Sequence, residues 1–167
     1  MKVLVSSCVM GNNVRWNGKN KKAKDLQEWA DKNSIILVPV CPEDELFGTP
    51  RAPIRLSHID GNTVANMKGS DVMPVLDSKC ADIFERHPDA VGFIGIARSP
   101  SCGISVGVKN LGRTIKGSMH KTTSIPTVEY NQIRNDKGKQ DFLRRVIKAH
   151  EHICSRQESG TSSKVPL

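Results

Sequence analysis

The sequence has few aromatic residues, no long apolar run and no closely spaced pair of cysteines. Phe, Trp and Tyr together make up only 4% of its 167 residues. No apolar run approaches the roughly 20 residues that a membrane-spanning helix needs, so an integral membrane protein is not expected. The five cysteines are odd in number and widely scattered. A disulfide framework is therefore not expected, and reduced thiols or metal ligands are favoured instead.

The charge balance and the amino terminus restrict the cellular setting. The chain begins directly with an apolar strand pattern and lacks the charged and apolar regions of a signal peptide, so we expect a cytoplasmic protein with no membrane partner. The formal net charge of +8 indicates anionic partners. Because the basic residues are spread along the chain and aromatic residues are few, this charge does not separate nucleic acid from an anionic small molecule.

Short apolar runs alternate with segments of helical periodicity, which is typical of α/β proteins. Helices are predicted over residues 22–33, 71–86 and 139–154, and strands over residues 2–5, 34–40, 90–97 and 124–130. The strand at 34–40 is almost wholly apolar, as expected for a strand covered on both faces. The segment at 104–123 is rich in Gly, Lys and Ser and gives no clear prediction.

These elements predict one compact α/β domain over residues 1–154. Its sheet should be short, mostly parallel and flanked by helices, in a Rossmann-like arrangement. A small hairpin insertion is expected over Leu56–Val64, with Asp60 and Gly61 at its turn. Residues 155–167 are polar and small, so we expect a disordered tail there.

Three of the cysteines share one placement, because Cys8, Cys41 and Cys102 each follow a predicted strand. Ligands of open α/β sheets lie outside the carboxyl ends of the strands, so we expect these thiols to meet there. Cys80 and Cys154 instead lie on predicted helices beside apolar residues, and both are interpreted as small buried hydrophobes.

Three thiols at one edge of a sheet predict a metal centre of undetermined kind. Structural zinc takes four ligands, often from closely spaced cysteine pairs, and this sequence has no such pair. Thiolates also suit iron–sulfur clusters. Spacing alone leaves this choice open. The acidic run after Cys41 is expected to lie in a long irregular loop, and Trp16 is interpreted as a packing residue near the site.

Several short motifs resemble those of the DUF523 family, which includes thiouracil desulfidases. The resemblance extends from about residue 3 to residue 103, and the CPE and SPSCG motifs together make it specific. The matching residues are Val5-Ser6-Ser7-Cys8, Gly11, Val14-Arg15, Gly18, Cys41-Pro42-Glu43, Pro50-Arg51 and Ser99-Pro100-Ser101-Cys102-Gly103.

The resemblance implies a 4Fe-4S cluster held by Cys8, Cys41 and Cys102. Its fourth iron would bind the sulfur of a thiolated pyrimidine, sulfide would leave, and the carbonyl product would form without net redox change. Glu43 and Ser99 occupy the motif positions associated with proton handling, with Glu43 as general base. The alternatives are a solvated loop acid or a helix N-cap for Glu43, and a turn-forming hydroxyl for Ser99.

Substrate binding is expected from Arg15, Arg51 and Ser101. The two arginines could hold a carbonyl or a phosphate, or equally pair with Asp44 and Glu45. Trp16-Asn17 replaces a Tyr-Asp pair that many family members carry, so the preferred base, nucleoside or nucleotide stays open. Two other functions remain in view, namely an accessory module that acts on thiolated RNA and a structural metal protein without turnover.

Overall fold

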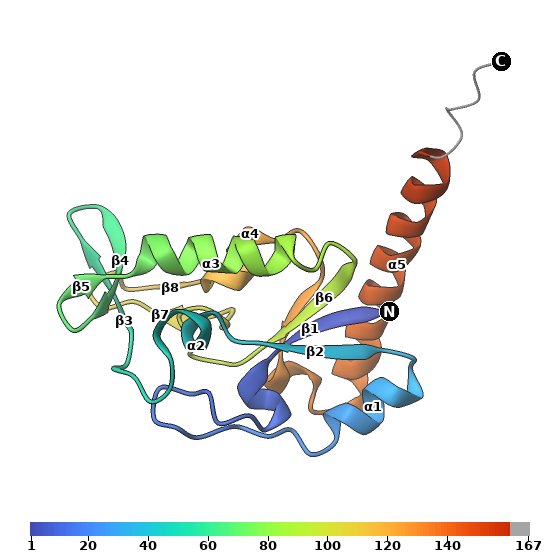
Figure 1. The fold of residues 1–167 in the computed structure, drawn as a ribbon, viewed down its shortest axis with the longest axis horizontal. Helices are drawn as coiled ribbons and strands as arrows, with labels where there is room; N and C mark the ends of the chain where they lie inside the picture. The colour runs from blue at the N-terminus through green and yellow to red at the C-terminus, as the bar shows by residue number, and fades with distance from the viewer. Residues whose placement is uncertain (161–167) are drawn as a thin grey trace.

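The computed structural model describes residues 1–160, with side chains to Ser155, and is built around one four-stranded sheet (Figure 1). Its strands are β1 (Lys2–Ser6), β2 (Ile36–Val40), β6 (Ala90–Gly95) and β9 (Thr127–Glu129). They lie in the order β2-β1-β6-β9, and each neighbouring pair is parallel. The predicted α/β class with a short parallel sheet is confirmed.

Helices cover both faces of the sheet. Successive side chains of a strand point to opposite faces, so each strand contributes residues to both cores. Val3 and Val5 of β1 belong to the core under two helices, while Leu4 belongs to the core on the opposite face. The helices on the Val3 face are α1 (Leu26–Lys32) and α5 (Asp136–Gly160), and those on the Leu4 face are α3 (Met73–Glu85) and α4 (Ser118–Thr122).

The strand β2 lies at the edge of the sheet, where only β1 pairs with it. Its residue Ile36 is 65% exposed. The prediction that residues 34–40 form a strand covered on both faces is therefore wrong. An apolar composition does not distinguish an edge strand from a central one, since both positions accept Val, Ile and Leu.

The predicted hairpin insertion is confirmed and lies apart from the parallel sheet (Figure 1). Strands β3 (Arg55–Ile59) and β4 (Asn62–Met67) are antiparallel. Asp60 and Gly61 between them both have positive φ, at 48° and 80°, as the tight turns of two-residue hairpins require. A two-residue strand, β5 (Ser70–Asp71), completes this small sheet.

The unassigned segment at 104–123 contains a second small sheet and a helix. Strands β7 (Val106–Gly107) and β8 (Thr114–Ile115) pair as antiparallel neighbours, and α4 follows them. Val106 packs with residues of the hairpin in a satellite core separate from the two cores of the main sheet.

The acidic run after Cys41 forms a short helix, α2 (Pro42–Phe47), and not the irregular loop that the sequence predicted. Pro42 occupies the first helical position, where its missing N–H costs nothing. Glu43, Asp44 and Glu45 fill the first turn, where the helix dipole favours negative charge. Glu43 therefore has a fixed backbone position at the second residue of the helix.

The last helix, α5, continues to Gly160, past residue 154 where the sequence predicted its end. Residues 155–160, the first part of the predicted tail, belong to α5 in the structure, and the Arg, Gln and Glu in this stretch have high helix propensity. Residues 161–167, the rest of the predicted disordered tail, lie outside the described residues. Through residue 160, none of the helices combines the length and the apolar character that crossing a membrane requires.

Candidate functional site

Three thiols lie at the carboxyl edge of the sheet, each delivered by a different strand. Cys8 is in the 3-10 helix that follows β1, Cys41 is the residue between β2 and α2, and Cys102 is in the loop after β6. Because β2, β1 and β6 are neighbours, all three cysteines line one open cleft of about 1090 Å³. The predicted meeting of these three residues is found, and their metal-binding role stays a proposal.

Burial, and the proximity of the other thiols, raise the pKa values of the three cysteines. Burial raises the pKa of Cys8 to about 11, and the neighbouring Cys41 adds to the rise. Burial likewise raises the pKa of Cys41 to about 12, with Cys102 as the next cause. The buried Cys102 thiol also has its pKa raised to about 12. Metal binding must therefore displace protons from these thiols, which makes loading easier as the pH rises.

The three thiols supply soft donors at one cleft. Among residues 1–155, no three His, Cys, Asp or Glu side chains are grouped closely enough to hold one metal ion together. A four-iron cluster binds each thiolate at a different iron, so its ligands lie farther apart than the ligands of one ion. Three soft donors facing a roomy cleft fit such a cluster.

The other two cysteines lie outside the cleft. Cys80 is fully buried between α3 and the sheet, as predicted. Cys154 is exposed, so its interpretation as a buried hydrophobe is wrong. The reason is visible in Figure 1, where the end of α5 projects beyond the sheet and has no layer to pack against.

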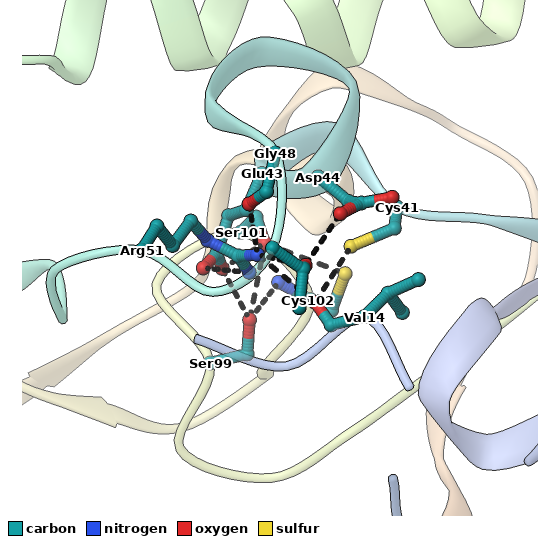
Figure 2. A network of polar contacts seen from close by, with 10 residues as sticks. Val14, Cys41, Glu43, Asp44, Gly48, Arg51, Ser99, Ser101 and Cys102 are labelled. Carbon is teal, nitrogen blue, oxygen red and sulfur yellow. Dashed lines mark hydrogen bonds and ion pairs between the residues drawn. The ribbon is translucent and has the colours of Figure 1, made fainter. Parts of the chain in front are cut away.

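Glu43 lies at the centre of a buried polar network beside Cys102 (Figure 2). Its Oε1 accepts hydrogen bonds from Ser99 Oγ at 3.0 Å and from Ser101 Oγ at 2.6 Å. Its Oε2 contacts Arg51 Nη2 at 3.0 Å. The predicted residues Glu43, Ser99, Ser101 and Arg51, which are distant in the sequence, are thus brought together at one side of the cleft.

The hydroxyl protons of this network can be assigned from its geometry, because each serine has only one proton to donate. Ser101 Oγ lies 2.6 Å from Glu43 but 3.5 Å from the Cys102 sulfur, so its proton belongs with the carboxylate. Ser99 also donates to Glu43 and accepts the backbone N–H of Cys102 at 3.1 Å. The contact of Ser101 with the Cys102 sulfur is therefore the weaker of its two hydrogen bonds.

Arg51 contacts groups of the protein through both of its terminal nitrogens, Nη1 and Nη2. Its side chain is only 5% exposed, and besides Glu43 it donates to the carbonyl oxygens of Val14 and Gly48 and to the hydroxyl of Thr49. Asp44 and Glu45 were possible acidic partners of Arg51 from the sequence, and in the structure its partner is Glu43. Its contacts fix the position of the carboxylate.

Positive charge gathers on the rim of the cleft. The described acidic residues form no ion pair with six cleft-lining cations, which are Arg15, Lys21, Lys22, Lys24, Arg98 and Arg134. Trp16 also lines the cleft and is 44% exposed, so its interpretation as a packing residue is wrong. An exposed indole among cations is suited to a planar, anionic ligand.

Two residues that were not predicted from the sequence fix the position of the Cys102 loop by hydrogen bonds to its backbone. Glu129 accepts the backbone N–H of Ile104 at 2.6 Å. Burial lowers the pKa of His120, so its ring is neutral near pH 7, and its Nε2 donates to the Cys102 carbonyl at 2.8 Å. A side chain at Gly95 would stand 1.9 Å from that same carbonyl oxygen. A glycine at a strand end signals such a close approach, whereas nothing in the sequence signals His120.

The fold and the site together define a three-layer α/β protein with a three-thiol cleft at the carboxyl end of its parallel sheet. Residues 3–129 match the family model of 2-thiouracil desulfurase. The chain therefore belongs to the 2-thiouracil desulfurase (DUF523) family, as its motifs predicted.

Two similar proteins carry the comparison further. YbbK of Bacillus subtilis strain 168, described as uncharacterized, is 25% identical over 150 residues, which span 80% of this chain and 98% of YbbK. A solved structure of the [4Fe-4S]-dependent thiouracil desulfidase TudS superposes with a TM-score of 0.61, covering 79% of this chain and 92% of that one. Its sequence identity is 21%, so the likeness shows a shared fold.

Proposed function

We propose that this protein is an iron–sulfur cluster-dependent, non-redox desulfidase of thiolated pyrimidines. Cys8, Cys41 and Cys102 would hold a 4Fe-4S cluster, in line with the cluster dependence of the TudS structure. When bound, the cluster supplies a Lewis-acidic iron with affinity for sulfur. The observation that carries the proposal is that the Glu43 network borders the same cleft as the three thiols.

The overall reaction exchanges one chalcogen for another. Water supplies the oxygen, the C=S bond of the substrate is broken, and sulfur leaves as sulfide with no net gain or loss of electrons. Glu43 takes a proton from the attacking water, and Ser99 orients that water or relays the proton. Arg51 keeps the carboxylate in place, and Ser101 holds it on the side of Cys102.

The direct test is anaerobic purification followed by iron, sulfide and activity measurements on the same sample. We expect about four irons and four sulfides per chain for a 4Fe-4S centre. Thiouracil should be converted to uracil with one sulfide released per base. A protein that contains tightly bound zinc and releases no sulfide would instead be a structural metal protein.

A phosphorylated thionucleotide should be a better substrate than the bare base. A phosphate contact with the rim cations is a charge-assisted hydrogen bond worth about 1.5 to 3 kcal/mol. This corresponds to a roughly tenfold to hundredfold gain in kcat/KM. Kinetics on thiouracil and on its nucleoside monophosphate, each at one fixed ionic strength, would measure the gain.

A matched pair of variants assigns that gain to the cleft. Arg15→Gln removes a cation that lines the cleft and should reduce the advantage of the nucleotide over the base. Lys148→Gln removes an exposed cation on α5 that does not line the cleft, and should leave the advantage unchanged. Equal efficiency on base and nucleotide in the wild-type protein would show that the rim serves another purpose.

RNA that carries a thiolated base is the second candidate partner. It is favoured by the number of rim cations, because six unpaired charges exceed the charge of about −2 on one phosphate monoester. Tight binding of RNA that weakens steeply as salt is raised would support an accessory role on RNA.

A further inference from the structure

Trp16 is the exposed aromatic residue of the cleft. It lines the cleft, is 44% exposed and, within residues 1–155, belongs to none of the three apolar cores. The other aromatic residue that lines the cleft, Tyr130, packs against a core and donates its hydroxyl proton to Asp25 at 2.9 Å. The indole of Trp16 is therefore the aromatic surface that the cleft offers to a ligand.

The backbone around Trp16 is fixed by hydrogen bonds. The N–H of Arg15 donates to the Lys19 carbonyl at 3.1 Å, and the N–H of Gly18 donates to the Arg15 carbonyl at 2.8 Å, which closes a tight loop around Trp16. Gly18 has a positive φ of 68°, a conformation that favours glycine. Because the backbone is held, a ligand that binds the indole has to order only its two side-chain torsions.

Arg51 connects this loop to the Glu43 network. Its backbone N–H donates to the Trp16 carbonyl at 2.9 Å. Its side chain donates from Nη1 to the carbonyl oxygen of Val14 at 2.9 Å and from Nη2 to Glu43 Oε2 at 3.0 Å. One residue thus sets the position of the Trp16 segment relative to the carboxylate. A flat ring stacked on the indole would share this frame with the proposed general base.

We propose that Trp16 is a substrate-binding residue, whose indole stacks on the pyrimidine ring of the thiolated substrate. This inference rests on the proposed function, because it requires a pyrimidine in the cleft. Stacking recognises the π-face of a base and does not depend on the hydrogen bonds of its edge. Trp16 would hold the ring, while the Glu43 network serves the attacking water.

Two ligands that differ mainly in the flatness of the ring isolate the stacking contact. Uracil and dihydrouracil share their carbonyl and N–H groups, but saturation of the carbon–carbon double bond removes the aromatic face of the ring. The dissociation constants of both are measured by calorimetry with the anaerobically purified full-length protein. The measurement needs no turnover.

Wild type should bind uracil roughly 5-fold or more tightly than dihydrouracil. Trp16→Phe should keep this preference. Trp16→Leu keeps an apolar side chain without a π-face, so it should bind uracil roughly 5-fold to 140-fold more weakly and lose the preference. A role of Trp16 in folding alone would weaken both ligands equally and leave their ratio unchanged.

Trp29→Leu is the matched control. Trp29 is the other tryptophan of the chain, lies on α1, packs against a core and does not line the cleft. Its removal should leave the ratio of the two dissociation constants at the wild-type value. Melting curves of all variants are recorded alongside, and Trp16→Leu should unfold with wild type because the indole that it replaces is exposed.

The inference is overturned if wild type binds uracil no better than dihydrouracil, if it binds neither, or if Trp16→Leu keeps the preference. Sulfide release from thiouracil by the same preparation would then leave the proposed desulfidase intact. A preference for uracil that depends on Trp16, without any sulfide release, would keep the stacking site and overturn the proposed function.

Discussion

Cys102→Ser is expected to lose nearly all of its bound iron, and Cys8→Ser and Cys41→Ser should do the same. Each thiol comes from a different strand end, so no neighbouring cysteine can take the place of the one removed. A serine hydroxyl is a hard ligand that remains protonated near neutral pH, whereas iron–sulfur clusters bind soft thiolates. Iron and sulfide per chain, together with the visible absorption of the cluster, measure the loss.

Two further serine variants serve as controls for this prediction. Cys154→Ser changes an exposed thiol and should leave iron content and stability at wild-type values. Cys80→Ser places a hydroxyl in a fully buried site and should cost about 1 to 3 kcal/mol of stability, yet retain the cluster. Full iron loading of Cys102→Ser would contradict the three-ligand site.

The sequence predicted the sheet and the convergence of the thiols because both depend on local patterns. Apolar runs fix the strands, and the carboxyl ends of parallel strands meet at one edge whatever the loops do. The meeting of Cys8, Cys41 and Cys102 in one cleft could therefore be predicted from their positions directly after strands. The hairpin was predicted equally well, since Asp60-Gly61 is a strong turn signal.

What the sequence did not predict depends on contacts between distant segments. The pairing of Arg51 with Glu43 requires α2 to be a helix, and that helix was mistaken for a loop. The support of the Cys102 loop by His120 and Glu129 comes from the segment that gave no clear pattern and from the strand after it.

Glu43→Gln is expected to keep the cluster and to turn over about 10²-fold more slowly than wild type. Glutamine keeps the size of the side chain and can still accept hydrogen bonds from Ser99 and Ser101, but it cannot take a proton from water near neutral pH. A positioned general base typically contributes about 10² to 10⁴-fold to a rate. Arg51 loses its counter-charge in this variant, yet it keeps its contacts with Val14, Gly48 and Thr49.

Glu45→Gln is the matched control, because Glu45 lies in the same first turn of α2 but pairs with Arg86 outside the cleft. It should match wild type in both iron content and turnover. Ser99→Ala should resemble Glu43→Gln, with some loss of iron as well, since Ser99 also accepts the backbone N–H of Cys102. Turnover per intact cluster, with iron quantified in the same samples, separates proton transfer from cluster assembly. If Glu43→Gln turned over as fast per cluster as wild type, the network around Glu43 would serve to hold the Cys102 loop, and the base would have to be sought elsewhere in the cleft.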